Sequence, residues 1–286
     1  MIVSSKQALA HQPRSIRLVG VLALVSALLV VGCSSKKPSV EKSAALTGAE
    51  RLEHRASSAY IKGDLAGARK DFLTAGQVYS SLALVDAAAS VQLSLARIDL
   101  DEGRAKEAQA RIDQVLGQAT QGSEAILPAT LLLANGRAAA LYLQQKNIPA
   151  ADIRLTAAER LCGNSCDSLS ALQSLRSNWL LASNDASSGQ TKAGAALAAA
   201  TSPADKANAL RSLAESGLAL KQTTQAIAYA EQALQLDQQL GASLRVIADL
   251  DLLARIHGKV GAADKAATYA AQAQLASSAH QQLGGK

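Results

Sequence analysis

The amino-acid sequence predicts an all-α protein built as a solenoid of helical hairpins, and three observations support this prediction. Alanine accounts for 61 of the 286 residues, whereas phenylalanine and tryptophan occur once each. Strong helix formers predominate, and runs of β-branched residues are absent. Small and apolar residues recur in one spacing about every 40 positions. A chain with so few large side chains cannot fill a thick globular core, but it can pack slender helices closely.

Residues 1–32 have the composition of an export signal. Lys6, Arg14 and Arg17 precede the apolar stretch 18–31, and no acidic residue occurs among residues 1–32. A membrane-spanning helix needs about 20 apolar residues, so this stretch is too short to span a bilayer. We therefore expect residues 1–32 to be a cleaved signal peptide.

The sequence Val30-Val31-Gly32-Cys33 resembles the lipobox of bacterial lipoproteins, although leucine is commoner than valine at the first position. The resemblance implies cleavage before Cys33, a diacylglyceryl thioether on its sulfur and acylation of the new amine. Ser34 stands where an aspartate would favour retention in the inner membrane. The resemblance thus implies lipid anchoring at the periplasmic face of the outer membrane of a Gram-negative bacterium. The alternative is an ordinary signal followed by a coincidental cysteine.

The charge of the chain belongs mainly to its N-terminal part. The formal net charge of the whole chain is +6, but residues 43–286 hold 23 basic and 22 acidic residues, which gives +1. Residues 33–43 are polar and are expected to form a lipidated flexible tether. The near-neutral body and its few aromatic residues give no reason to expect a nucleic-acid partner.

Residues 44–286 are expected to form the repeat domain. In each of five segments a leading alanine is followed, four and seven residues later, by small or apolar residues, and another alanine lies twelve residues upstream. The leading alanines are Ala68, Ala108, Ala151, Ala226 and Ala266. The long interval after Ala151 leaves room for a degenerate sixth unit, for which the spacing favours Ala193, Leu197 and Ala200. The polar stretch 183–192 is then expected to be a loop.

This spacing resembles the tetratricopeptide repeat, with Phe72 at its aromatic position and Gly63, Gly103 and Gly261 at its turn. The period of about 40 residues is similar to that of variants with longer helices, and most signature tryptophan, tyrosine and proline positions are filled by other residues. The resemblance implies a right-handed superhelix whose first helices line a concave protein-binding face. An alanine-rich helical bundle or another α-solenoid is the alternative.

Cys162 and Cys166 are expected to form a structural disulfide, because an exported protein favours pairing of its two remaining cysteines. Gly163 and Asn164 between them favour a turn that brings the pair together. No set of metal ligands, phosphate loop or catalytic motif is found, and the four histidines are scattered. We therefore expect no catalytic, cofactor-binding or metal-binding residues, and a protein that is not an enzyme.

A candidate partner-binding groove follows from projecting the repeat phase onto the first helices. Four arginines share one side of these helices, with a tyrosine or leucine about one turn away on some of them. The groove residues are Tyr60, Arg97, Leu100, Arg137, Leu143, Arg211, Leu218 and Arg255. Guanidinium groups beside apolar side chains suit an extended segment that carries carboxylates. Alternatively, these arginines decorate the helix surface in pairs four residues apart, such as Arg97 with Asp101.

The sequence thus predicts a periplasm-facing, lipid-anchored scaffold or adaptor that binds other envelope proteins, or a peptide segment of them. Such a protein could act in the assembly of an envelope machine. The alternative is a cell-wall or polysaccharide-processing factor with a pocket formed across the repeats. The sequence predicts neither the partner's identity nor the oligomeric state.

Overall fold

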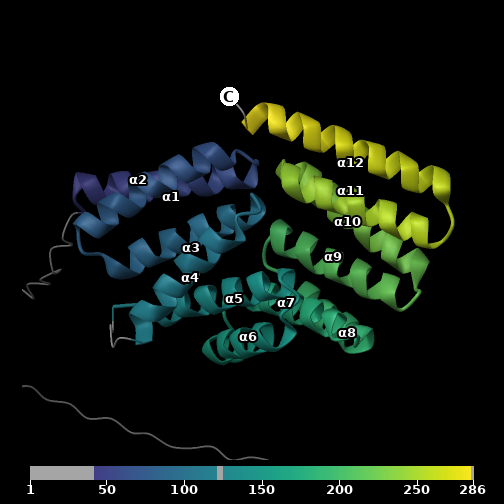
Figure 1. Cartoon of the computed structure of the whole chain (residues 1–286), viewed down its shortest axis with the longest axis horizontal. Helices are drawn as coiled ribbons and strands as arrows, with labels where there is room; N and C mark the ends of the chain where they lie inside the picture. Colours follow the sequence, from purple (N-terminus) through teal and green to yellow (C-terminus); the bar gives the residue numbers. More distant parts are fainter. Residues whose placement is uncertain (1–41, 121–124, 285–286) are drawn as a thin grey trace, which may run out of the picture. The chain divides into compact units, whose positions relative to one another are not determined.

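A computed structural model of the chain describes residues 42–120 and 125–284, and within them the protein is an all-α solenoid without strands. Consecutive helices pack in pairs, which gives six hairpins in the described chain (Figure 1). The helices are α1 (Ala44–Ile61), α2 (Leu65–Ser81), α3 (Val85–Asp101), α4 (Ala105–Thr120), α5 (Pro128–Gln144), α6 (Ile148–Cys162), α7 (Leu169–Ala182), α8 (Ala186–Ala198), α9 (Pro203–Ala219), α10 (Thr223–Leu240), α11 (Ser243–Lys259) and α12 (Ala263–Gly284).

Each of the six hairpin turns contains one residue in a left-handed backbone conformation. The three glycines predicted at turns have positive φ, and lysine or asparagine takes the same place in the other hairpins. The φ values are 84° at Gly63, 75° at Gly103, 57° at Lys146, 65° at Asn184, 60° at Lys221 and 75° at Gly261. In every hairpin this residue stands five positions before a small residue of the second helix. The turn geometry therefore fixes the phase of all six units.

This phase corrects the predicted register of the degenerate unit. The residue five positions after Asn184 is Gly189, and it packs against Ser177, which lies twelve residues upstream. A Cβ atom added at Gly189 would lie 3.3 Å from the carbonyl oxygen of Ser177. Ala193 is buried as the second position of the pattern, whereas the predicted Leu197 is only partly buried. The prediction was wrong because glycine and serine fill the small positions that alanine fills elsewhere.

The predicted loop over 183–192 is also wrong, because most of it belongs to α8. Only Ser183, Asn184 and Asp185 form the turn. The Asp185 side chain caps α8 by accepting a hydrogen bond from the backbone N–H of Ser188 at 3.0 Å. An aspartate N-cap satisfies a backbone donor that would otherwise lack a partner at the start of a helix. Burial of Gly189 then holds the polar first turns of α8 against α7.

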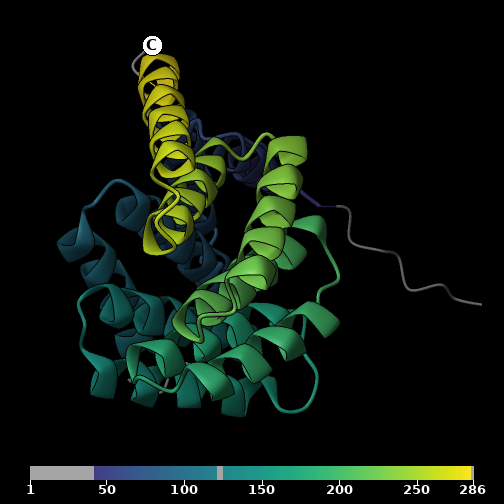
Figure 2. The ribbon, with the colours of Figure 1, turned by 90° about the vertical axis from the view of Figure 1, so that its right-hand side faces the viewer.

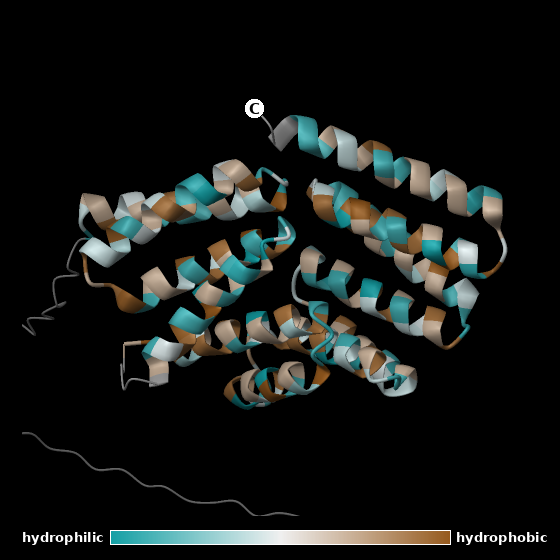
Figure 3. Cartoon of the chain, viewed as in Figure 1, coloured by the Kyte–Doolittle hydropathy of each residue, from teal (hydrophilic) through white to brown (hydrophobic). Residues whose placement is uncertain are grey.

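The core of the solenoid combines small residues at the closest helix contacts with buried leucines and isoleucines between the helices. The leading alanines of α2, α4, α6 and α10 are fully buried, and so are their partners on α1, α3, α5 and α9. In the last hairpin Ala254 and Ala266 are only partly buried and Ala270 is exposed, since no further hairpin covers α12 in the described chain. Figure 3 shows hydrophobic and hydrophilic residues alternating along the helices. No helix among the described residues is long and apolar enough to cross a membrane.

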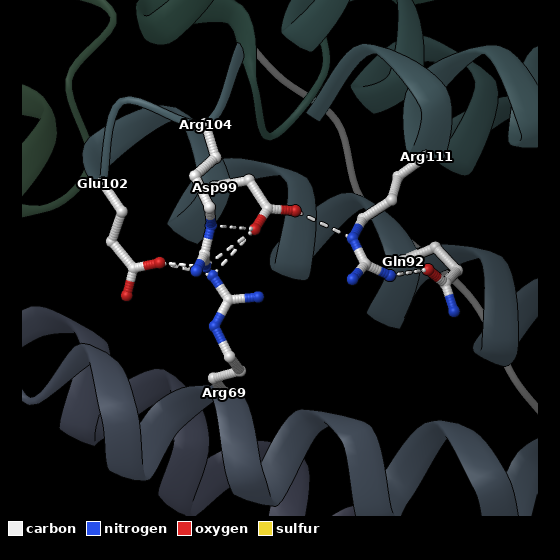
Figure 4. Close-up of polar contacts among 6 residues, drawn as sticks. All are labelled: Arg69, Gln92, Asp99, Glu102, Arg104 and Arg111. Atoms are coloured by element: carbon white, nitrogen blue, oxygen red, sulfur yellow. Dashed lines mark hydrogen bonds and ion pairs between the residues drawn. The ribbon is translucent and has the colours of Figure 1, made fainter. Parts of the chain in front are cut away.

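A buried carboxylate joins the first two hairpins. Asp99 on α3 is 1% exposed and accepts hydrogen bonds from Arg69 of α2 at 2.8 Å and from Arg111 of α4 at 2.8 Å. Arg104 donates to the same carboxylate at 3.0 and 3.2 Å, and Arg111 also donates to Gln92 at 2.6 Å (Figure 4). Several charged donors compensate the cost of burying one carboxylate. The network fixes α2, α3 and α4 relative to one another.

The described hairpins curve until the first and the last of them touch (Figure 1 and Figure 2). The Ser243 hydroxyl, at the start of α11, donates to the carbonyl oxygen of Lys62 at 3.4 Å and lies 3.0 Å from Nδ1 of His280. Leu244 packs against the hydrophobic core of the first hairpin. We call this contact the end contact. The end contact thus brings the two ends of the described repeat array together on the inner side of the solenoid.

Candidate functional site

The inner face of the solenoid holds a cavity of about 550 Å³, which we call the inner cavity. Its lining comes from the first helices of four hairpins, α5, α7, α9 and α11, and from Ser168 just before α7. Leucines such as Leu133 and Leu175 form apolar walls, and Asn178 adds an exposed polar group. The fold therefore places the cavity on the side that the repeat phase predicted for partner binding.

A smaller space of about 60 Å³ lies at the end contact, and we call it the end cavity. Tyr60 of α1 and Arg97 of α3 line it from one end of the solenoid, and residues of α9, α10 and α11 line it from the other. Asn208 and Arg245 line both cavities. The two cavities therefore adjoin at these two side chains.

Arg211, which lines the inner cavity, is neutralised by two carboxylates. Its Nε donates to Asp249 at 2.6 Å, and its Nη2 donates to Asp237. Both aspartates are buried, with exposures of 0% and 3%. Burial acts to lower the pKa of Arg211, but its hydrogen bonds with these carboxylates and their charges outweigh burial and raise the pKa. Arg211 is therefore a structural link between α9, α10 and α11.

Arg137 and Arg245 differ from Arg211, because no carboxylate of the described residues lies within ion-pair distance of either one. The Nε of Arg137 is inaccessible to solvent and has no hydrogen-bond partner in the described chain. Burial lowers the pKa of Arg137 to about 9, and the charges of Arg97 and Arg245 act in the same direction. Burial likewise lowers the pKa of Arg245, which donates only a 3.4 Å hydrogen bond to Asn208.

Arg97 faces the end cavity and stacks on an aromatic ring. Its guanidinium carbon lies 4.0 Å from the centroid of Tyr60, a distance typical of a cation–π contact. The Tyr60 hydroxyl donates to Asp101 on the same helix as Arg97. That carboxylate is therefore already engaged by the tyrosine. Three arginines, Arg97, Arg137 and Arg245, lie around the junction of the two cavities. The charge of Asp101 acts to raise the pKa of Arg137 and of Arg245, although it forms no ion pair with either one.

The structure brings half of the predicted groove residues to these cavities. Arg137 and Arg211 line the inner cavity, and Tyr60 and Arg97 line the end cavity. The other four lie elsewhere: Leu100 and Leu218 pack against hydrophobic cores between helices, the partly buried Leu143 lines neither cavity, and the exposed Arg255 bonds Glu215 at 2.6 Å. Leu100 and Leu218 thus face neighbouring helices, although Arg97 and Arg211 on the same helices face the cavities.

Three of the four arginines of the row, all except Arg137, form contacts between helices rather than the pairs four residues apart that were the alternative. Arg211 bonds carboxylates of α10 and α11, Arg255 of α11 bonds Glu215 of α9, and Arg97 of α3 stacks on Tyr60 of α1. In the described structure these three side chains therefore join helices of the same or adjacent hairpins.

Arg245 and Asn208 belong to the site and were not predicted. Arg245 lies nine residues before Ala254, and Arg137 lies two before its repeat alanine, Ala139. The difference of seven residues is two helical turns, so both arginines fall on the same face of their helices. The position of Arg245 relative to its repeat alanine could therefore have predicted that it faces the same side as Arg137. Asn208 gave no comparable signal, because asparagine at a helix surface is unremarkable.

The disulfide predicted between Cys162 and Cys166 is present, with Cα atoms 5.2 Å apart. Gly163, with a φ of 61°, ends α6 between them. The predicted signal peptide and the lipidation site Cys33 lie outside the described residues. Within the described chain, no group of three or more histidine, cysteine or acidic side chains is placed to hold a metal ion.

The sequence matches no known family profile and no curated protein sequence. Solved structures share its fold. BtubC from P. vanneervenii is 18% identical, with a TM-score of 0.50 over 81% of this chain and 91% of that one. A Signal Transduction ATPase with Numerous Domains from Pyrococcus horikoshii, which has a tetratricopeptide repeat sensor, is 11% identical with a TM-score of 0.57. This match covers 82% of the present chain and 36% of the ATPase. The chain therefore has a helical-repeat fold like that of a tetratricopeptide sensor.

Proposed function

We propose that this protein is a scaffold or adaptor that binds an extended, acidic segment of another protein along its inner face. The observation that carries the proposal is the inner cavity, which is open to a partner at the exposed Asn178 and presents unpaired arginines beside leucines. Helical-repeat folds suit this role because stacked hairpins offer an extended concave surface. Catalysis has no part in the proposal: the chain acts by binding.

The chemistry of the inner face indicates the kind of segment. Apolar walls such as Leu133 and Leu175 would contact aliphatic side chains, and arginines bind carboxylates strongly through paired hydrogen bonds. A segment that alternates acidic and aliphatic residues fits both. An extended segment also leaves its backbone free to bond to the asparagines of α7 and α9.

Photo-crosslinking tests the proposed binding face. A photoreactive residue at Asn178 should capture one partner reproducibly in envelope preparations, whereas one at Ile153 should not. Ile153 is the matched control because it is 69% exposed on α6, a second helix of its hairpin, and does not line the cavity. Capture at Ile153 but not at Asn178 would contradict binding along the inner face.

The place of action is also a proposal, supported by the resemblance of the Cys33 region to a lipobox. We propose that the protein is anchored by lipid at the periplasmic face of the outer membrane and binds envelope proteins there. Acyl chains hold a protein on a membrane in proportion to the CH2 groups that they bury.

We predict that Cys33→Ser abolishes membrane attachment and leaves the repeat domain folded. The reason is that the substitution removes the thiol proposed to carry the lipid and leaves the sequence of the repeat domain unchanged. Membrane fractionation and circular dichroism measure the two effects. As a control, the double variant Cys162→Ser/Cys166→Ser should remain with the membrane. A Cys33→Ser protein that still fractionates with the outer membrane would contradict the lipid anchor.

One observation favours the alternative of a polysaccharide-processing factor: the inner cavity spans several hairpins, as a pocket formed across repeats would. Its lining, however, contains no aromatic side chain, and aromatic faces commonly grip sugars. Incubating the purified chain with cell-wall glycans distinguishes the two functions. If the chain turned over a glycan and captured no protein partner, the polysaccharide-processing function would be favoured over the scaffold.

A further inference from the structure

The junction of the inner cavity and the end cavity collects positive charge from distant parts of the chain. Arg97 comes from the second hairpin, Arg137 from the third and Arg245 from the sixth. Arg245 lines both cavities, Arg97 lines the end cavity and Arg137 lines the inner cavity. Two carboxylates of the described chain also line these cavities, Asp237 and Glu215, and each forms an ion pair with another arginine, Arg211 or Arg255. Asp101 accepts a hydrogen bond from Tyr60.

We propose that Arg97, Arg137 and Arg245 form a binding site for an anionic oxygen group, a carboxylate or a phosphate, and that the bound anion holds the two ends of the solenoid together. The inference deepens the function proposed above, because it assigns the group of the bound segment that the arginines would recognise. Its test nevertheless needs no protein partner.

The first argument is that the site lacks acceptors. The Nε of Arg137 is buried without a partner in the described chain, and a buried donor without an acceptor is unfavourable. Burial and the neighbouring arginines lower the pKa of both Arg137 and Arg245, and the charge of Asp101 compensates theirs only in part. An oxyanion would supply acceptors and negative charge together. Arginine is well suited to either anion, because its planar donors match carboxylate and phosphate oxygens.

The second argument is that the site exists only while the ends touch. Arg97 and Arg245 line the same end cavity because Leu244 packs against the hydrophobic cluster of α1, α2 and α3 and Ser243 bonds Lys62. Opening of the end contact would separate the two arginines. An anion that binds both must therefore favour the closed arrangement, since a ligand stabilises whichever state it binds more tightly.

Calorimetric titration of the purified full chain tests the site with two probes, orthophosphate and succinate. Both probes, or one of them, should bind the unsubstituted chain. Arg137→Gln and Arg245→Gln should each weaken that binding at least about tenfold, the expected loss for a charge-assisted hydrogen bond. Arg160→Gln is the matched control and should bind normally, because Arg160 is exposed on α6 and lines neither cavity.

The two probes distinguish the sources of the anion. Binding of succinate alone indicates a carboxylate of a protein segment, and binding of phosphate alone indicates a phosphoryl ligand. Failure of both probes to bind, or equal binding by Arg245→Gln, would overturn the site. Because no partner is present, this failure is separate from a failure to crosslink at Asn178.

Two further measurements exclude a merely structural role for these arginines. Without added anion, Arg245→Gln should raise the midpoint of thermal unfolding, because it relieves repulsion among like charges; a structural arginine would lower the midpoint. Spin labels at Lys62→Cys and Gln281→Cys, in a Cys33→Ser background, report the end contact. The bound probe should narrow the measured distance distribution, and the Arg245→Gln change should abolish this response. An unchanged distribution in the chain that keeps Arg245 would contradict the coupling.

Discussion

At the scale of single residues, Lys146 and Lys221 occupy turn positions that suit glycine. Both have positive φ, 57° and 60°, where three of the other four hairpins have glycine and one has asparagine. A side chain in the left-handed region costs about 1–2 kcal/mol per residue, and glycine avoids that cost while losing more entropy on folding. The identity of a turn residue thus changes stability without changing the fold.

We predict that Lys146→Gly and Lys221→Gly each raise the free energy of unfolding by about 1 kcal/mol, for the reason just given. Urea denaturation at neutral pH measures the change. Asn184→Gly is the control and should gain less, because asparagine tolerates the left-handed region better than lysine does. Equal gains at all three turns would contradict this explanation.

Asp249 makes stability depend on pH. Burial, reinforced by the charge of Asp237, raises the pKa of Asp249 from its ordinary 3.8 to about 6, although Arg211 opposes the change. Between these values the folded state retains a proton that the unfolded state has lost. The free energy of unfolding contributed by Asp249 therefore falls as pH rises through this window.

We predict that Asp249→Asn removes this decrease, which amounts to about 2 kcal/mol between pH 4 and pH 6.5. Urea denaturation curves collected across that range measure it as the difference between variant and unsubstituted chain. Asp251→Asn, at an exposed position of the same helix, should leave the pH dependence unchanged. If the free energy of unfolding of Asp249→Asn depended on pH as that of the unsubstituted chain does, Asp249 would not be the source of the pH dependence.

At the scale of the helix, α7 and α8 approach closely because Gly189 has no side chain. A Cβ atom there would lie 3.3 Å from the Ser177 carbonyl oxygen and 3.4 Å from the Leu181 side chain. Gly194, five residues further along α8, has open space around its Cα. A side chain at Gly189 would therefore meet neighbouring atoms, whereas a side chain at Gly194 would not.

We predict that Gly189→Leu lowers the free energy of unfolding by about 1–3 kcal/mol, because the added side chain must force the two helices apart. Gly194→Ala, the control, should raise it by about 1 kcal/mol through helix propensity alone. Thermal unfolding followed by circular dichroism compares the two. Destabilisation by both variants would contradict the distinction.

The hairpin phase could be predicted from the sequence wherever alanine fills the tight positions, as at Ala68 and Ala151. These positions are fully buried and accept only small side chains, so alanines mark the spacing clearly in the sequence. The phase of α7 and α8 could not be predicted, because Gly189 and Ser177 take the two tight positions that alanine takes in the other hairpins. Alanine is also so frequent in α8 that it fits several registers equally well. A turn residue such as Asn184 was an independent marker of phase, since asparagine also accepts positive φ.

The candidate site was predictable only where it depends on a single helix. The repeat register placed Arg97, Arg137 and Arg211 on the inner side, because a helix fixes which residues share a face. The meeting of Arg245 with Arg97 depends on the curvature accumulated over all the hairpins. That curvature is the sum of small rotations between units, and no short stretch of sequence encodes it.

At the scale of the repeat domain, the end contact can be tested at a glycine. A Cβ atom at Gly63 would lie 2.1 Å from the Ser243 hydroxyl and 2.8 Å from the His280 ring. Gly103 has a similar positive φ but nothing within 4 Å of such an atom. A side chain at either position would therefore strain the backbone to a similar degree, but only a side chain at Gly63 would also clash with neighbouring atoms.

We predict that Gly63→Ala and Gly103→Ala both lose about 1–2 kcal/mol of unfolding free energy from the backbone. Gly63→Ala should lose about 1 kcal/mol more, because its methyl group pushes the last hairpin away from the first. Urea denaturation measures the loss, and labels at Lys62→Cys and Gln281→Cys should report a longer distance in Gly63→Ala alone. Equal losses and equal distances would show that the ends are not held together.

The end contact also bears on how the repeat domain opens. In an open solenoid the terminal hairpins contact one neighbour each, so they unfold first and independently. Here Ser243 and Leu244 contact the first hairpin, and Ser243 bonds a residue 181 positions earlier in the chain. Backbone amides of α1 should therefore exchange their hydrogens faster when the last hairpin opens. Opening of one terminal hairpin should therefore destabilise the other, although eight helices separate the two hairpins along the chain.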